Sequence, residues 1–307
     1  MKAFLILEDG TVFTGTSIGS TKSVISEIVF NTSMTGYLEV LTDPSYAGQA
    51  VVMTYPLIGN YGVTPDMESA QPWPDGYIVR ELSRIPSNFR CQGTIQDFLK
   101  EHDIPGIAGI DTRALTKILR EKGTMNGMIT TDENYKLDEI LPQLHVYNTG
   151  NVVDKVTCSE KKVLKADGYK VALLDFGAKN NIAQSLHKRG CEVTIYPAHT
   201  TAEEILSSDP DGIMLSNGPG DPKACTDIIK EVKKLYDSEV PIFAICLGHQ
   251  LMALATGADT YKLKYGHRGG NHPVKDLETG RVYISSQNHG YAVDADSLDQ
   301  TVAVPAF

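Results

Sequence analysis

The two halves of the chain differ in how apolar and polar positions alternate. From residue 1 to about residue 150 the apolar runs are short, and turn-forming segments recur, among them EDGT, NTSMTGY, TDPSY and YPLIGNYG. This pattern predicts a strand-rich α/β unit. One helix is expected over residues 111–123, because Asp111 supplies an N-cap and Gly123 follows where the helical pattern stops.

From residue 169 onward, strands and helices alternate regularly. KVALLDFG predicts a buried strand that ends in glycine, residues 179–189 a helix, and CEVTIYP a second strand. A short helix in EEIL, a third strand in DGIMLSNGPGDP, a helix over about residues 226–235 and the strand PIFAIC continue the pattern. Strands and helices at this spacing form a parallel sheet with right-handed crossovers, whose site lies at the carboxyl ends of the strands.

The change of pattern predicts two domains within an α/β fold class. The first covers residues 1–150 and the second residues 169–307. The polar stretch between them, residues 151–168, has no long periodic run and is expected to be a linker. A length of 307 residues agrees with two domains.

Composition narrows the functional classes. Twenty-eight basic against 38 acidic side chains give a net charge of −10, and no basic stripe occurs, which argues against nucleic acid as a partner. No apolar run approaches the roughly 18 residues that span a bilayer, and the apolar run at residues 3–7 is too short for a signal-peptide core. The five cysteines are scattered without a C-x-x-C pair, which predicts no metal site or disulfide framework and a reducing, cytoplasmic location.

The segment PIFAICLGHQ, residues 241–250, carries the first candidate for chemistry. Five apolar residues run into Cys246, and Gly248 opens the expected helix. The letters A-I-C-L-G match a nucleophile elbow, G-x-S-x-G, with Ala244 for the first glycine and cysteine for serine. A helix N-terminus favours the thiolate, and the Leu247 N–H is then aimed to hold an oxyanion. The alternative is a buried structural cysteine.

The segment SNGPGDP, residues 216–222, is the second candidate. Gly218 and Gly220 flank a proline, so that no side chain covers their backbone N–H groups. The loop follows a neighbouring strand and is expected to supply a second oxyanion donor or an anion nest. The alternative is an ordinary turn between a strand and a helix.

These two segments together resemble the class I, or triad, glutamine amidotransferases. FGAKNNI, YGHRGGNHPV and SSQNHGYAV continue the resemblance through the second half. In the first half, FNTSMTGYLEVLTDPSYAGQ, YPLIGNYG and GIDTRALTKILREKG resemble the small subunits of carbamoyl-phosphate synthetase. The resemblance covers nearly the whole chain. It implies a flavodoxin-like, mostly parallel sheet with helices on both faces in the second half, and hydrolysis of glutamine through a cysteine thioester.

The resemblance also implies the site residues. Cys246 is the expected nucleophile, with oxyanion donors from Leu247 N–H and the NGPG loop, most simply Gly218. Ser45 of DPSY is expected to reach the substrate from the first domain. The family usually has phenylalanine where Tyr291 stands, which matters little if backbone atoms bind the substrate. The residues expected to bind glutamine are Ser45, Gly218, Gly220, Leu247, Gln250, Asn288, Gly290 and Tyr291.

The partners follow from the same resemblance. A separate large subunit is expected to join the ammonia to bicarbonate with ATP and Mg, and this chain has no P-loop of its own. The expected partners are therefore the large subunit and L-glutamine, with no cofactor in this subunit, and no nucleic acid or membrane. The product is expected to serve arginine or pyrimidine synthesis.

The family's catalytic His and Glu stand in an HPEASPGP-like stretch that does not occur here. The sequence ends at SLDQTVAVPAF, and this predicts a truncated or incompletely recorded chain that hydrolyses glutamine very slowly. The His-Pro at His272 belongs to a different motif. His249 is expected to point along its helix away from the thiol, and His289 to form a structural hydrogen bond.

Two other functional hypotheses stand beside the first. One is an amidase that serves another synthetase, such as the anthranilate or GMP enzymes, although the segments of the first half argue against it. The other is a non-catalytic, partner-stabilising subunit that keeps the glutamine pocket without turnover.

Overall fold

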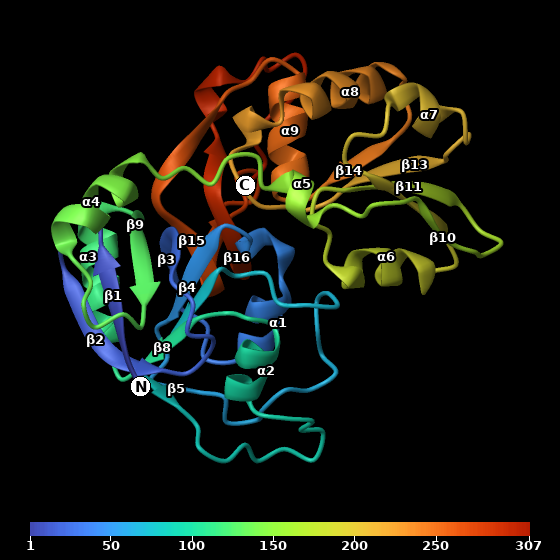
Figure 1. The fold of residues 1–307 in the computed structure, drawn as a ribbon. Helices are drawn as coiled ribbons and strands as arrows, with labels where there is room; N and C mark the ends of the chain where they lie inside the picture. The colour runs from blue at the N-terminus through green and yellow to red at the C-terminus, as the bar shows by residue number, and fades with distance from the viewer. The chain divides into compact units, whose positions relative to one another are not determined.

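The computed structural model describes residues 1–307, which form two compact units. The first unit comprises Met1–Thr149, Lys264–His272 and Ser285–Gln287, and the second comprises Gly150–Leu263, Pro273–Ile284 and Asn288–Phe307. Figure 1 shows the elements of both units along the chain. Each unit has its own hydrophobic core and is described by itself.

The first unit is built on a closed barrel. Its strands follow the order β1-β2-β8-β6-β4-β3-β9, with parallel pairs from β3 through β4 and β6 to β8 and antiparallel pairs elsewhere. Closure removes the unpaired strand edges at which chains associate. The strands are β1 (Lys2–Leu7), β2 (Val12–Ser17), β3 (Val24–Asn31), β4 (Gln49–Met53), β6 (Gly76–Ile78), β8 (Gly106–Ala108) and β9 (Met125–Thr130).

Both faces of the first strand, β1, are buried. Leu5 and Leu7 pack in one apolar cluster, while Phe4 and Ile6 point the other way, into a cluster with Ile140 of α4 (Leu137–Val146). Successive side chains of a strand face opposite sides, so one continuous apolar run serves two cores. The short run that opens the sequence is therefore a fully buried strand.

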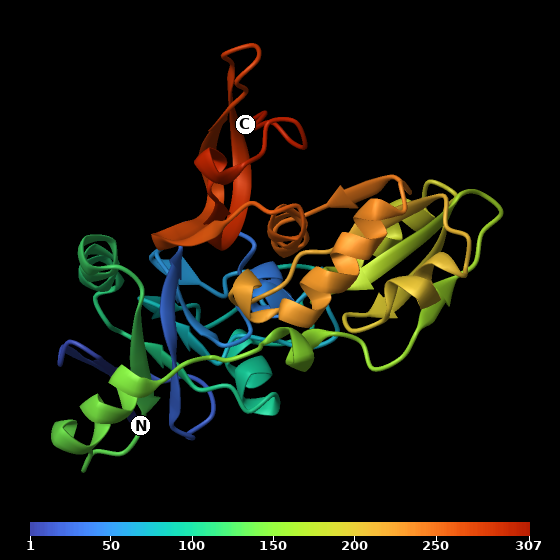
Figure 2. The ribbon, with the colours of Figure 1, turned by 90° about the horizontal axis from the view of Figure 1, so that it is seen from above.

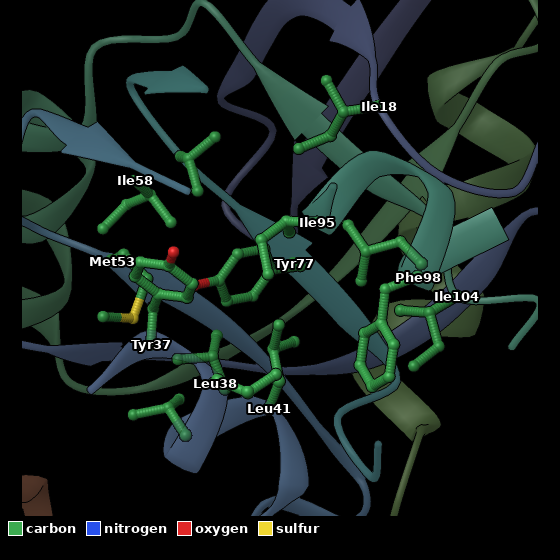
Figure 3. Packing of buried hydrophobic residues seen from close by; sticks show 14 of the residues in the cluster. Ile18, Tyr37, Leu38, Leu41, Met53, Ile58, Tyr77, Ile95, Phe98 and Ile104 are labelled. Atoms are coloured by element: carbon green, nitrogen blue, oxygen red, sulfur yellow. The ribbon is translucent and has the colours of Figure 1, made fainter. Parts of the chain in front are cut away.

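The remaining helices of the first unit share apolar clusters with the barrel strands. The predicted helix at 111–123 is confirmed as α3 (Thr112–Lys122), because the Asp111 carboxylate accepts from Ala114 N at 2.9 Å and Gly123 ends it at φ +105°. Figure 3 shows the largest core cluster, in which Tyr37, Tyr77 and Phe98 lie among aliphatic side chains. The other elements are α1 (Tyr37–Thr42), η1 (Pro44–Tyr46), α2 (Ile95–Glu101) and the parallel pair β5 (Leu57–Ile58) and β7 (Glu81–Leu82).

The second unit holds a five-stranded sheet in the order β10-β12-β11-β13-β14. Its four strands from β12 to β14 run parallel and alternate with helices, which confirms the expected α/β architecture. The strands are β10 (Lys162–Leu164), β11 (Lys170–Asp175), β12 (Glu192–Pro197), β13 (Gly212–Leu215) and β14 (Ile242–Ala244). The helices are α5 (Val153–Val156), α6 (Asn180–His187), α7 (Ala202–Leu206), α8 (Thr226–Asp237) and α9 (Leu247–Ala255), with the 3₁₀ turns η2 (Pro222–Ala224) and η3 (Ala295–Ser297).

Helices cover both faces of this sheet. Leu174 of β11 packs in a cluster with Ile228 of α8 and Leu251 of α9. Its neighbour Leu173 faces the other way, into a cluster with Ala183 of α6. The continuous apolar run of β11 thus follows from burial on both sides, as is usual for a parallel sheet.

The stretch 151–168, expected to be a linker, is more ordered than its composition suggests. It contains α5 and β10, and β10 pairs antiparallel with β12 at the edge of the sheet. The expectation missed β10 because a strand of three residues that begins with Lys162 shows no periodicity. Its edge position leaves two of its three side chains exposed, so no apolar alternation is required.

A long hairpin follows α9. It consists of β15 (Thr260–Lys275) and β16 (Val282–Val293), drawn as the orange and red ribbon of Figure 2. Residues of this hairpin belong to both units. No helix of the protein has the length and apolar content that crossing a membrane requires.

Candidate active site

Cys246 stands at a strained turn between β14 and α9. Its backbone has φ 51° and ψ −109°, outside the regions that residues with a Cβ normally adopt. Hydrogen bonds fix the turn on both sides, from Ile245 N to Leu215 O at 3.0 Å and from Gly248 N to Ser216 O at 3.0 Å. Such strain persists where the surroundings enforce it, and it clusters at functional sites. The structure therefore has the strand-to-helix elbow that the sequence predicted.

Two glycines permit the close backbone approaches at the elbow. A Cβ on Gly248 would lie 2.6 Å from Leu215 O and 2.7 Å from its carbonyl carbon, which are backbone atoms that cannot move aside. A Cβ on Gly218 would lie 2.2 Å from Phe176 O and 2.7 Å from Leu247 Cδ2. The NGPG loop and the first turn of α9 therefore touch, as expected for two neighbouring parallel strands.

The thiol of Cys246 is partly exposed at the start of α9. Its Sγ donates to the carbonyl oxygen of Asn288 in β16 at 3.4 Å. The side chain of Leu247 is buried in the core at 1% exposure, so only its backbone is available to the site. The Leu247 N–H lies in the first helical turn, where no carbonyl of the helix can accept it. The position suits an oxyanion donor.

The SNGPGDP loop is held to the turn that follows β11. The Asn217 side chain donates to Gly177 O at 2.9 Å and accepts from Lys179 N at 3.1 Å. The Ser216 hydroxyl accepts from Phe176 N at 2.9 Å. Both side chains are buried, so the loop is fixed against the turn, with Gly218 buried as well and Gly220 partly exposed.

Some of the expected substrate-binding residues of the second unit contact one another at the start of α9. The Gln250 side chain donates to the Tyr291 carbonyl at 2.8 Å. The backbone carbonyl of Asn288 accepts the hydrogen bond from the Cys246 thiol. Gly290 lies between Asn288 and Tyr291 in β16, and Gly220 lies in the NGPG loop with φ +91°. The structure thus places Asn288 at the Cys246 thiol and Tyr291 at Gln250, and the part of this set in glutamine binding stays a prediction.

Ser45 lies in the first unit, in the short turn η1. Its backbone N–H donates to the Asp43 carboxylate at 2.9 Å, and Asp43 itself is buried at 2% exposure. The adjacent Tyr46 hydroxyl accepts from the Asn31 amide at 2.8 Å. The turn is therefore well fixed, and the expected part of Ser45 in glutamine binding stays a prediction of the resemblance.

The histidines near the motifs have separate surroundings. His289 Nδ1 lies 2.7 Å from Tyr291 O, a local hydrogen bond within β16. His249 lies on the outer side of α9, where neighbouring protein atoms partly desolvate the ring and lower its pKa. His272 belongs to the first unit, with its ring 5.4 Å from that of His267.

Sequence reasoning missed one residue that organises the site. The buried carboxylate of Asp175 accepts from Gly177 N at 2.9 Å, Ala178 N at 2.7 Å and Cys158 N at 2.8 Å. It shapes the turn after β11, on which the NGPG loop rests. The available signal was the D-x-G spacing at the end of a buried strand, which is typical of an Asx turn.

Known families and curated relatives match most of the chain. The family model described as "Carbamoyl-phosphate synthase small chain, CPSase domain" matches residues 5–129, and "Glutamine amidotransferase class-I" matches residues 172–307. A carbamoyl phosphate synthase small chain from Listeria monocytogenes is 53% identical over 299 residues, which are 97% of this chain and 82% of the relative. One from Clostridium perfringens is 53% identical over 294 residues, 95% of this chain and 84% of that protein. Among solved structures, a glutamine amidotransferase from Thermotoga maritima matches with a TM-score of 0.34 and 16% identity, over 42% of this chain and 63% of its own.

The parallel sheet, the cysteine elbow and the matching model define the second unit as a class-I glutamine amidotransferase. With the relatives that match along nearly its full length, the chain belongs to the family of carbamoyl phosphate synthase small chains. Its function is that of the glutamine-hydrolysing subunit, which implies a large chain as partner. Neither an amidase for another synthetase nor a non-catalytic subunit is favoured.

Proposed function

We propose that Cys246 is the nucleophile that forms a thioester with glutamine, and that the released ammonia passes to the large chain. The observation that carries this proposal is the elbow itself. A partly exposed thiol stands at a strained φ of 51°, directly before a helix whose first turn packs closely against Gly218 of the NGPG loop. Backbone strain that the surroundings enforce clusters at functional sites, which supports the assignment.

The proposed chemistry has two halves. The Cys246 sulfur attacks the side-chain amide carbon of glutamine, and the C–S bond forms as the carbonyl electrons move to oxygen. The N–H groups of Leu247 and Gly218 are suited to hold that oxyanion. Collapse breaks the C–N bond, and the nitrogen leaves as ammonia with the proton that the thiol gave up. Water then attacks the thioester, which breaks the C–S bond to give glutamate and return the thiol.

The residues around the elbow are proposed to hold the substrate. The proposed set is Gly220, Gln250, Asn288, Gly290 and Tyr291, of which Asn288 accepts from the thiol and Tyr291 from Gln250, both through backbone carbonyls. Recognition by backbone atoms is insensitive to the side chain, which supports tyrosine as a substitute for phenylalanine at position 291. Ser45 is proposed to contribute from residues 1–150.

The large chain is proposed to supply what this chain lacks. It would use ATP, Mg and bicarbonate to convert the ammonia to carbamoyl phosphate in the cytoplasm, for arginine or pyrimidine synthesis. We also propose that residues 169–307 act as the amidotransferase domain, residues 151–168 as its connection, and residues 1–150 as the part specific to this family.

A substitution separates the two activities. Cys246→Ser in the complex with the large chain should abolish carbamoyl phosphate synthesis from glutamine and leave synthesis from added ammonia intact. The ammonia-dependent rate is the control for folding and assembly. Retention of the glutamine-dependent rate would show that Cys246 is not the nucleophile.

A further inference from the structure

The loop between β7 and α2, residues 83–93 with the sequence SRIPSNFRCQG, presents apolar side chains to solvent. We call it the docking loop. Phe89 is 96% exposed, the highest value of any large apolar side chain in the protein, and Ile85 is 82% exposed. Single exposed apolar residues are ordinary. Here, however, two of the three most exposed stand four positions apart on one loop, which Figure 1 draws in teal at its lower edge, leading into α2.

The backbone of the docking loop is fixed despite this exposure. Hydrogen bonds attach its start, middle and end to the segment 58–63. They run from Ser83 N to Ile58 O at 2.7 Å, from Ser87 N to Asn60 O at 2.8 Å and from Gln92 N to Val63 O at 2.8 Å. A loop held in this way presents its side chains from a preorganised frame, which lowers the entropy cost of binding.

Packing and charge fix the same frame further. Gly62, whose φ is +70°, lies under the docking loop. A Cβ at this position would lie 2.4 Å from Cys91 Sγ and 3.0 Å from Pro86 Cβ, so the loop packs closely against it. Arg90 pairs with Asp66 at 2.7 Å. The loop itself has no acidic residue, and Arg84 lies at its start, in a chain whose net charge is −10. The loop is therefore a locally basic, apolar surface.

We infer that the docking loop is part of the surface that binds the large chain, with Phe89 and Ile85 as its apolar anchors. The inference rests on the proposed function in that the partner is the large chain. The loop falls within residues 5–129, which match the carbamoyl phosphate synthase small chain model, while the amidotransferase model matches only residues 172–307. A surface for the partner specific to this family belongs in the part specific to it. Exposed aromatic and arginine side chains are the residue types that dominate protein interfaces.

The complementary surface has a defined chemistry. It should offer an apolar pocket for Phe89 and an acidic rim opposite Arg84. Charge pairs at a rim mainly accelerate association, while buried aromatic anchors mainly slow dissociation. The two kinds of residue therefore predict different kinetic effects.

The test is the affinity of this chain for the large chain of the same organism. Phe89→Ala should raise Kd roughly 30-fold through a faster off-rate, and Ile85→Ala about tenfold. Arg84→Glu should slow association, with a smaller effect at high salt. The matched control is Val146→Ala on α4, because Val146 is also 82% exposed and lies in the same unit. It should leave Kd within about twofold.

The glutaminase rate and the melting temperature of the isolated chain should not change in any of these variants. A wild-type Kd for both Phe89→Ala and Ile85→Ala would overturn the inference. The inference would also be overturned if Phe89→Ala abolished self-association of this chain and left its Kd for the large chain unchanged. If the wild type hydrolyses no glutamine but the Kd pattern holds, the proposed function fails and the docking inference stands.

Discussion

Cys225 and Cys246 both stand directly before a helix of the second unit, and their surroundings differ. Cys225 precedes α8 and is 3% exposed, whereas Cys246 precedes α9 and is partly exposed. Burial, together with the nearby carboxylates of Asp154 and Asp221, raises the pKa of Cys225 to about 11. The helix N-terminus favours a thiolate, but at Cys225 burial and repulsion outweigh it. A helix N-terminus alone therefore does not make a nucleophile.

The two backbones differ in the same sense. Cys225 has φ −90° and ψ 45° and follows the 3₁₀ turn η2. Its backbone N–H donates to the carbonyl oxygen of Pro222, the first residue of that turn, at 3.1 Å. Cys246 has a positive φ that Gly248 makes possible by letting α9 approach β13. The strained elbow leaves Cys246 partly exposed, whereas the relaxed turn leaves Cys225 buried in the core. Exposure and strain together distinguish the candidate nucleophile.

The largest expected effect separates the two cysteines by activity. Cys246→Ala should lower kcat for glutamine hydrolysis at least about 10³-fold, because no other group can form the thioester. Cys225→Ala should leave kcat within about threefold, since Cys225 touches no substrate. Steady-state glutaminase assays of the two purified variants measure this. Similar losses in both would remove the distinction.

The next effect is chemical reactivity. At pH 7.5 a thiol with a pKa of about 11 is thiolate in roughly one molecule in a thousand or fewer, and Cys225 is also buried. Iodoacetamide should therefore alkylate Cys246 at least about 100-fold faster than Cys225 in the native protein. Peptide mapping after timed quenching gives both rates in one sample, and denatured protein, in which the rates should converge, is the control. Comparable native rates would contradict the account.

A third effect is the pH dependence of stability. The folded pKa of Cys225 is raised, so the folded state holds this proton more tightly than the unfolded state does. The corresponding stability is complete below pH 9 and is lost as pH rises from about 9 to about 11, by roughly 2–3 kcal/mol. Cys225→Ala should remove that part of the alkaline loss. The measurement is urea unfolding of both proteins across this window, where parallel curves would count against it.

The smallest expected effect concerns the backbone of the elbow. Gly248→Ala should lower the free energy of unfolding by about 1–3 kcal/mol, because the new methyl group meets the backbone of Leu215. Gly212→Ala in β13 is the matched control, since its Cβ would meet nothing closer than Pro241 O at 3.6 Å. That variant should stay within about 0.5 kcal/mol of wild type. Equal losses in chemical denaturation would mean that the close approach at Gly248 is not limiting.

Local sequence patterns made part of the fold predictable. The α3 helix, the alternation of the second unit and the elbow at Cys246 each depend on residues close in the chain. The closed barrel was not predicted, because its closure depends on distant pairs such as β1 with β9 and on β6 and β8, which have only three residues each. Strands this short carry no periodicity of their own.

The candidate site divides in the same way. Short motifs in the sequence predicted Cys246 and Gly218 as site residues. They could not predict that the Gln250 side chain would donate to the carbonyl of Tyr291, 41 residues away. The carboxylate of Asp175 was missed for the same reason, because one of its partners, Cys158, is 17 residues distant and lies outside any motif. Long-range polar contacts become visible only in the folded chain.

The central claim is that the strained, partly exposed Cys246 carries the glutamyl group during turnover. The most direct measurement is acid quenching of the enzyme during reaction with isotopically labelled glutamine, followed by peptide mass spectrometry. The account predicts one labelled glutamyl group per chain, bound through sulfur to the peptide that contains Cys246 and released by hydroxylamine. A glutamyl group on Cys225 or another cysteine, or hydrolysis that proceeds with Cys246 alkylated, would contradict it.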